Sequence, residues 1–132
     1  MNVNKKVFLP AVLAVLCLAS VPVSAGVEDA LANICNIVKA NDKGELRKKM
    51  KVVQSDYQLR LGDYYDGISC DGNSLIRTAI LNEATDTGTL LVKKLPKSKL
   101  GTPEKDGILL TAWIESNGLT GSPIAGVVKE RM

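Results

Sequence analysis

DGNSLIRTAILNEATDTGTLLVKKL, residues 71–95, decides the fold of this chain. Its apolar residues recur at intervals of three and four in two runs, which is the spacing of one face of an α-helix. Ser74 can cap the first run, Thr85 or Asp86 can cap the second, and Pro96 ends the second. Because only a short polar turn separates the runs, the stretch predicts two helices folded back on one another.

The sequence on the N-terminal side of this stretch follows the same pattern. Residues 27–38 carry apolar side chains on one helical face, and residues 45–53 do so again after the turn at 41–44. Residues 54–71 are rich in Asp and Gly and predict an ordered loop, with a short extended piece near Tyr57 to Leu61. We therefore expect a first helical hairpin and then a long connection.

The C-terminal side predicts a third hairpin. A polar link at residues 97–106 precedes a helix whose apolar face holds Ile108, Leu109, Ala112 and Trp113. That helix stops at Asn117-Gly118, and a final helix begins at Ser122-Pro123. With aromatic residues at only 4% of the chain, the core must be built from aliphatic side chains. The predicted fold class is mainly α, a small stack of helical hairpins.

The hairpins show signs of internal repetition. Gly72–Asn82 aligns without a gap to Gly107–Asn117, and Asn41-Asp42 takes the place of Asn82-Glu83 and Asn117-Gly118 in the first hairpin. Residues 71–95 resemble an ankyrin repeat, although Arg77 stands where that motif has His and Leu75 where it has Pro. The resemblance implies hairpins that stack side by side, as ankyrin-like units or as an irregular bundle.

A second resemblance covers about residues 28–96. The runs NICNIVKANDKGELRKKMK and YDGISCDGNSLIRTAILNEA resemble a family of short exported proteins of Gram-negative bacteria that is catalogued only as a domain of unknown function. The resemblance implies an exported single domain with one pair of cysteines. It implies no activity.

The first 25 residues read as a secretory signal peptide. Lys5 and Lys6 precede an apolar segment at 7–18, and Val23-Ser24-Ala25 forms a small-residue cleavage site before Gly26. Two rival interpretations are an uncleaved membrane anchor, for which the apolar run is short, and lipidation at Cys17, which follows the bulky Leu16. We expect cleavage and export to the periplasm.

Cleavage would leave residues 26–132 as a single helical domain without a membrane span. It would contain the family-like core at 28–96 and a C-terminal hairpin at 103–132. The formal net charge would fall from +3 to +1, because Lys5 and Lys6 leave and no acidic residue leaves with them. A nearly neutral exported domain is not expected to bind nucleic acid.

Two cysteines, Cys35 and Cys70, remain after cleavage. In an oxidising compartment they predict a structural disulfide, which would stabilise the fold by about 3.5 kcal/mol in the chain-entropy model. A metal pair or a redox couple is the alternative. Neither is favoured, because the chain has no histidine and no Cys-x-x-Cys spacing.

The candidate chemistry lies in carboxylates. Without histidine the chain has no Ser-His-Asp or Cys-His arrangement, so we expect no enzyme and no cofactor. Asp63, Asp66 and Asp71 are candidates for a metal site or for acid–base catalysis, and turn formation beside glycines is the simpler interpretation. EF-hand spacing fails from each of the three.

The basic runs and the single tryptophan each have two interpretations. We expect the basic runs to be solvated helix faces; the alternative is that they bind an anionic envelope surface. They comprise Arg47, Lys48, Lys49, Lys51, Lys93, Lys94, Lys97 and Lys99. Trp113 is expected in the core rather than in a ligand platform.

The sequence therefore predicts an exported periplasmic protein that serves as a non-enzymatic protein-binding or accessory module. A periplasmic protein is the expected partner. The alternative function is a cation-binding protein or small carboxylate-dependent enzyme centred on Asp63, Asp66 and Asp71.

Overall fold

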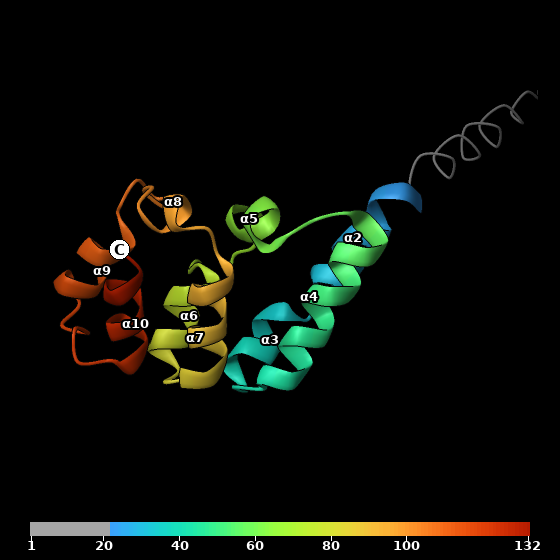
Figure 1. Ribbon diagram of the computed structural model, residues 1–132. Coiled ribbons are helices and arrows are strands. Elements are labelled where there is room, and N and C mark those ends of the chain that lie inside the picture. Colours follow the sequence, from blue (N-terminus) through green and yellow to red (C-terminus); the bar gives the residue numbers. More distant parts are fainter. Residues whose placement is uncertain (1–21) are drawn as a thin grey trace, which may run out of the picture.

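The computed structural model describes residues 22–132, and this part of the chain is helical (Figure 1). An isolated antiparallel bridge joins Cys70 and Asn73. The elements are α2 (Pro22–Leu31), α3 (Ile34–Lys39), α4 (Lys43–Tyr57), α5 (Leu61–Tyr64), η2 (Tyr65–Gly67), α6 (Leu75–Leu81), α7 (Thr85–Lys94), α8 (Lys97–Leu100), α9 (Leu110–Ser116) and α10 (Pro123–Arg131). The mainly α prediction is confirmed.

Three helical hairpins lie side by side in chain order (Figure 1). They are α3–α4, α6–α7 and α9–α10. The first packs on the second through α3 against α6 and α4 against α7, and α10 contacts both α6 and α7. This arrangement matches the predicted stack. The shorter α5 and α8 lie at one end of the hairpins, and α2 packs on α4.

The turn inside each hairpin closes in the same way. Its first residue beyond the helix cap adopts a left-handed conformation, with φ of 59° at Asn41, 53° at Glu83 and 65° at Gly118. That residue donates its N–H to the carbonyl three residues back, and the next residue donates to the carbonyl five back, which is the Schellman motif. The paired bonds are Asn41→Val38 with Asp42→Ile37, Glu83→Ile80 with Ala84→Ala79, and Gly118→Glu115 with Leu119→Ile114. Asn41 therefore corresponds to Glu83 and Gly118 rather than to Asn82 and Asn117. The alignment of the first hairpin with the other two that the sequence predicts is wrong by one residue.

Several predicted boundaries need correction. The first predicted helix is broken between α2 and α3 at Ala32-Asn33. The predicted extended piece does not form, because α4 continues to Tyr57 and α5 begins at Leu61. The Asp63 carboxylate accepts the N–H of Arg60 at 2.8 Å, which fixes the first turn of α5.

The third hairpin buries a different face from the predicted one. Helix α9 begins at Leu110 and buries Leu110 and Ile114, whereas Ile108 and Leu109 are 44% and 37% exposed. The reason is a turn before the helix, in which Glu104 donates its N–H to the carbonyl of Ile108 at 3.0 Å. The turn delays the helix and shifts its buried register.

Two ties join the first hairpin to the second at opposite ends of α3. At one end the Cys35–Cys70 disulfide, with 5.6 Å between the Cα atoms, confirms the predicted pair. At the other end the Asn41 side chain accepts the N–H of Asp86 at 2.8 Å and of Thr87 at 3.1 Å. Asn41 therefore caps α7, where Thr85 or Asp86 was expected to act.

Thr87 adds a buried hydrogen bond to the contact between Asn41 and α7. Its side chain is fully buried, and its hydroxyl donates to the carbonyl of Val38 at 3.0 Å. A buried hydroxyl without such a partner would cost folding free energy. The interface between the hairpins is therefore specified by polar contacts as well as by apolar burial.

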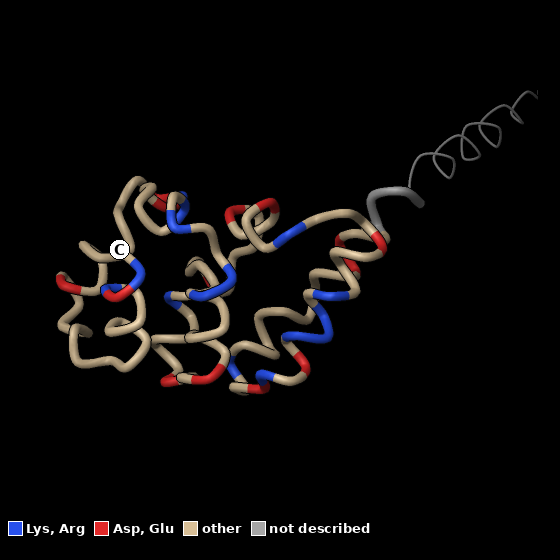
Figure 2. Tube along the Cα trace, in the orientation of Figure 1, with Lys and Arg blue, Asp and Glu red and all other residues tan. Residues whose placement is uncertain are grey.

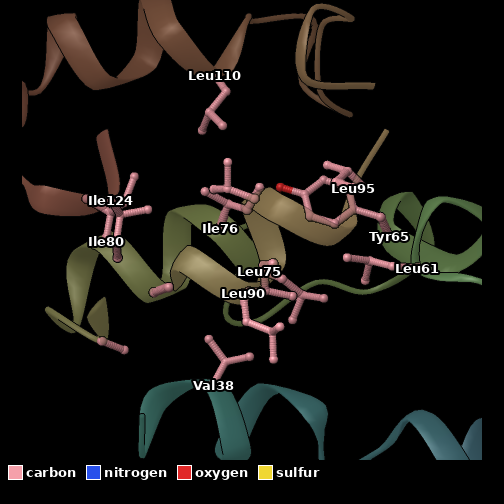
Figure 3. Close-up of a cluster of buried hydrophobic side chains, with 14 of the residues drawn as sticks. Val38, Leu61, Tyr65, Leu75, Ile76, Ile80, Leu90, Leu95, Leu110 and Ile124 are labelled. Carbon is pink, nitrogen blue, oxygen red and sulfur yellow. The ribbon is translucent and has the colours of Figure 1, made fainter. Parts of the chain in front are cut away.

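The core runs through all three hairpins (Figure 3). Val38 of α3 points toward Leu90 of α7, and Ile80 of α6 lies next to Ile124 of α10. Leu75, Ile76, Ala79 and Ile80 are all buried, as the periodicity of the second hairpin predicted. Aliphatic side chains dominate this core, as the composition predicted.

Gly88 permits the closest approach between the second and third hairpins. A Cβ atom at this position would collide with Cδ1 of Ile124, lie 2.7 Å from its Cγ1 and lie 3.1 Å from Cβ of Ala79. Ile124 is itself buried, so it has little room to move. The glycine is required by packing in a helix that would otherwise favour alanine.

Gly88→Ala should destabilise the protein by about 1–3 kcal/mol, because overpacking exceeds the gain in helix propensity. Gly126→Ala is the matched control, since Gly126 is in α10 and a Cβ there meets nothing within 4 Å. The control should stabilise by about 0.5–1 kcal/mol. Thermal unfolding followed by circular dichroism measures both, and equal melting temperatures for the two variants would contradict the packing of α7 on α10.

Candidate functional site

The three candidate carboxylates are far from forming one cluster. Asp63 caps α5 through the N–H of Arg60, Asp66 pairs with Lys99 at 2.6 Å, and Asp71 pairs with Lys39 at 2.9 Å. The hydrogen bond and charge of Lys39 hold the pKa of Asp71 below its ordinary value. Across residues 22–132 we find no group of three or more Asp, Glu or Cys side chains that could hold a metal ion. This geometry does not support the cation-binding alternative.

A buried ionic cluster occupies the interface between α6 and the turn before α9. Arg77 lies within the apolar run of α6, and its side chain is only 6% exposed. Its Nη1 and Nη2 donate to the Asp106 carboxylate at 2.7 and 3.2 Å, and its Nε lies 2.7 Å from Oε1 of Glu104. The guanidinium also lies 5.0 Å from the ring centre of Trp113.

Tyr65 extends this cluster toward η2. Its hydroxyl donates to Oε2 of Glu104 at 2.7 Å. Burial, together with the negative charge of Glu104, raises the pKa of Tyr65 far above its ordinary value, so the phenol stays protonated and remains a donor. A cavity of about 240 Å³ adjoins the cluster and includes Tyr65, Arg77 and Glu104 in its wall.

The cluster gives the third hairpin an acid-sensitive attachment. The hydrogen bond from Arg77 holds the pKa of Asp106 below its ordinary value. A depressed carboxyl pKa contributes stability that is present above the unfolded value of about 3.9 and is lost as the pH falls through the folded value. Nε of Arg77 and Oε1 of Glu104 form an ion pair without hydrogen-bond geometry, whereas the Arg77–Asp106 and Tyr65–Glu104 contacts are hydrogen bonds. All of these partners lie within the protein, so the cluster serves attachment.

A basic groove lies at the junction of the first two hairpins. It has a volume of about 720 Å³ and collects five cationic side chains, Arg47, Lys48, Lys51, Arg60 and Lys94. Gly44, Met50, Gln54 and Leu61 complete its lining. The cations come from α4, from the segment before α5 and from the end of α7, and Figure 2 shows basic positions along each of these.

The groove carries almost no compensating charge. Among residues 22–132, its lining includes no carboxylate. Its lysines and arginines have one ion pair among the described residues, a weak contact of 3.7 Å between Lys48 and Glu45. All five cationic residues are exposed. The groove is therefore an open, positively charged recess in a domain whose predicted mature charge is close to zero.

Only some of the predicted basic residues reach the groove. Arg47, Lys48, Lys51 and Lys94 do, whereas Lys49 faces a different hollow beside Asn36 and Lys99 is paired with Asp66. Lys93 and Lys97 are exposed outside it. Arg60 was missed by sequence reasoning, because it is a single cation between two helices and belongs to no run.

The Arg77 cluster was also missed. Its one visible signal is an arginine in the middle of the otherwise mainly apolar run LIRTAIL. Glu104 gives no local signal, because it stands in a polar link. Trp113 is half-buried against the core, which agrees with the expected packing role, and it also lies against Arg77.

No helix in the described part of the chain has both the length and the apolar character needed to cross a membrane.

Arg77→Met should destabilise the protein by about 3–5 kcal/mol, because it leaves the carboxylate of Glu104 buried without a cation. Arg47→Met, on the exposed face of α4, is the control and should change stability by less than about 0.5 kcal/mol. Adding Glu104→Gln to Arg77→Met should recover part of the loss. Urea unfolding measures all of these, and a loss for Arg77→Met no larger than for the control would contradict the cluster.

Comparison with known proteins places the chain in a family. No curated protein and no solved structure matches it. A family model does match residues 34–102, which is more than half of the chain and includes the first two hairpins, both cysteines and all the cations of the groove. The chain therefore belongs to the family described as "Protein of unknown function (DUF3718)".

Proposed function

We propose that this chain is exported to the periplasm of a Gram-negative bacterium and serves there as a non-enzymatic binding or accessory module. The observation that carries the proposal is the basic groove between α4, the segment before α5 and α7. Its cations are exposed and mostly unpaired, so they are available to a partner rather than committed to the fold.

Two features support export. The N-terminal residues have the charged, apolar and small-residue segments of a secretory leader. The disulfide between Cys35 and Cys70 is of the kind that persists in oxidising compartments. Cleavage after Ala25 would cut within α2 and leave Gly26 as the first residue, beside Tyr57 of α4.

The lining of the groove supports binding rather than catalysis. Its polar groups are lysines, arginines and one glutamine, which attract and orient an anion. A reaction would need a group that accepts a proton or attacks the substrate at neutral pH. Protonated lysine and arginine side chains do neither.

We also propose that the hairpins are ankyrin-like units. The support is the repeated Schellman closure and the packing of each hairpin on the next. Helical repeats of this kind expose one continuous surface along the stack, on which partners bind. The groove lies on such a surface because it crosses from the first hairpin to the second.

The test is expression of the full chain with a C-terminal tag in a Gram-negative bacterium, followed by cell fractionation. The periplasmic fraction should hold a protein that begins at Gly26 and is two hydrogens lighter than its reduced form. A reduced chain retained in the cytoplasm with Met1 in place would contradict export.

The binding role is tested in the same preparation by capture from a periplasmic extract. Material retained by the wild type should be lost with Arg47→Glu combined with Lys51→Glu. It should be kept with Lys49→Glu, which reverses a charge on the same helix outside the groove. Equal retention by all three forms would contradict a role for the groove.

A further inference from the structure

We propose that the basic groove binds a ligand that carries clustered phosphate groups. This inference rests on the proposed function, since it names the chemistry of the partner that the groove would bind. A phosphorylated lipid headgroup and a soluble polyphosphorylated molecule share this chemistry.

The cations of the groove repel one another, and among the described residues only Lys48 has an ion-pair partner, Glu45 at 3.7 Å. Arg47 and Lys51 are four residues apart on α4, and Lys48 and Lys51 are three apart, so they are neighbours on one face of the helix. Like charges at these spacings destabilise a helix. Arg60 and Lys94 add two more positive charges from other elements. A multiply charged anion would relieve all of these repulsions at once.

The shape of the site also favours a compact anion. The cations line a recess of about 720 Å³ rather than a flat or convex face. That volume lies within the range of roughly 300–1,000 Å³ that is typical of pockets for small molecules. A compact anionic group can enter the recess and contact cations from both hairpins. A partner with a flat surface would contact only the rim of the recess.

The donor groups of the groove suit phosphate. The guanidinium groups of Arg47 and Arg60 are planar forks that bind two oxygens of one phosphate, and lysines act as mobile point charges toward phosphate. Each phosphate carries up to two negative charges, whereas a carboxylate carries one. A few phosphates therefore neutralise the five cations within a smaller volume than carboxylates would need. Met50 and Leu61 supply apolar contact for the carbon part of such a ligand.

The experiment uses the oxidised protein recovered from the periplasm and titrates it with sodium tripolyphosphate in low-salt buffer by isothermal calorimetry. We expect saturable binding that weakens as salt is added, because exposed charges are screened. Arg47→Glu with Lys51→Glu, and separately Lys94→Glu, should weaken binding at least about tenfold, which corresponds to about 1.4 kcal/mol.

Two control substitutions outside the groove each match Lys94→Glu in charge, and the two combined match Arg47→Glu with Lys51→Glu. Lys49→Glu lies on α4 and Lys93→Glu lies on α7 beside Lys94, and neither residue lines the groove. Both should bind tripolyphosphate within about twofold of the wild type. Equal weakening in controls and groove variants would overturn the proposal, because it would indicate nonspecific attraction. Thermal unfolding establishes that every variant is folded.

Two further arms of the experiment identify the source of the phosphate. Vesicles of phosphatidylglycerol that bind the protein, and are displaced by tripolyphosphate, would support a lipid headgroup. Binding of tripolyphosphate without binding of these vesicles would support a soluble ligand. Phosphatidylcholine vesicles are the uncharged control.

Titration with a polyglutamate peptide distinguishes a phosphate-binding groove from a groove that binds any acidic partner. Binding of polyglutamate as tightly as tripolyphosphate would overturn the phosphate proposal in favour of an acidic protein segment. If neither anion binds but capture from the extract still depends on Arg47 and Lys51, the phosphate proposal fails and the binding module stands. If capture also ignores these residues, the proposed function fails as well.

Discussion

The junction between the first two hairpins is the constraint on which the rest of the structure depends. The disulfide holds one end of α3 to the turn before α6, and Asn41 and Thr87 hold the other end to the first turn of α7. With both ends fixed, α3 packs on α6 and α4 on α7. The positions of α4 and α7 then determine whether their cations face one recess or two separate solvent-exposed surfaces.

The second junction is built from different chemistry. The third hairpin is attached through close packing at Gly88 and through the buried pairing of Arg77 with Glu104 and Asp106. The family match ends at residue 102, before the two acidic partners of Arg77. The part of the chain that the family model covers therefore contains the first junction and the whole groove, while the third hairpin closes the far end of the core.

Local sequence signals predicted the local structure well. The periodicity of the second hairpin, the Ser74 and Ser122 caps and the stop at Asn117-Gly118 act within a few residues, and the structure contains them. Periodicity was wrong about the break between α2 and α3 and about the buried face of α9. Contacts between distant residues were not predictable in this way. Asn41 caps a helix that begins more than forty residues later, and Glu104 pairs with an arginine of another hairpin. The groove was foreseen only as basic runs, because one sequence cannot show which lysines share a face across two hairpins.

The most direct test of this account is native-state hydrogen exchange at Asp86 and Thr87. These N–H groups precede the first intrahelical bond of α7, and the Asn41 side chain is their one acceptor in the part of the chain that the structure describes. We predict that both amides are protected in the intact protein, and that Asn41→Ala removes this protection while Leu91 in the middle of α7 keeps its own. Exchange of Asp86 and Thr87 at the rate of an unstructured peptide in the unmodified protein would contradict the docking of the two hairpins, and with it the groove.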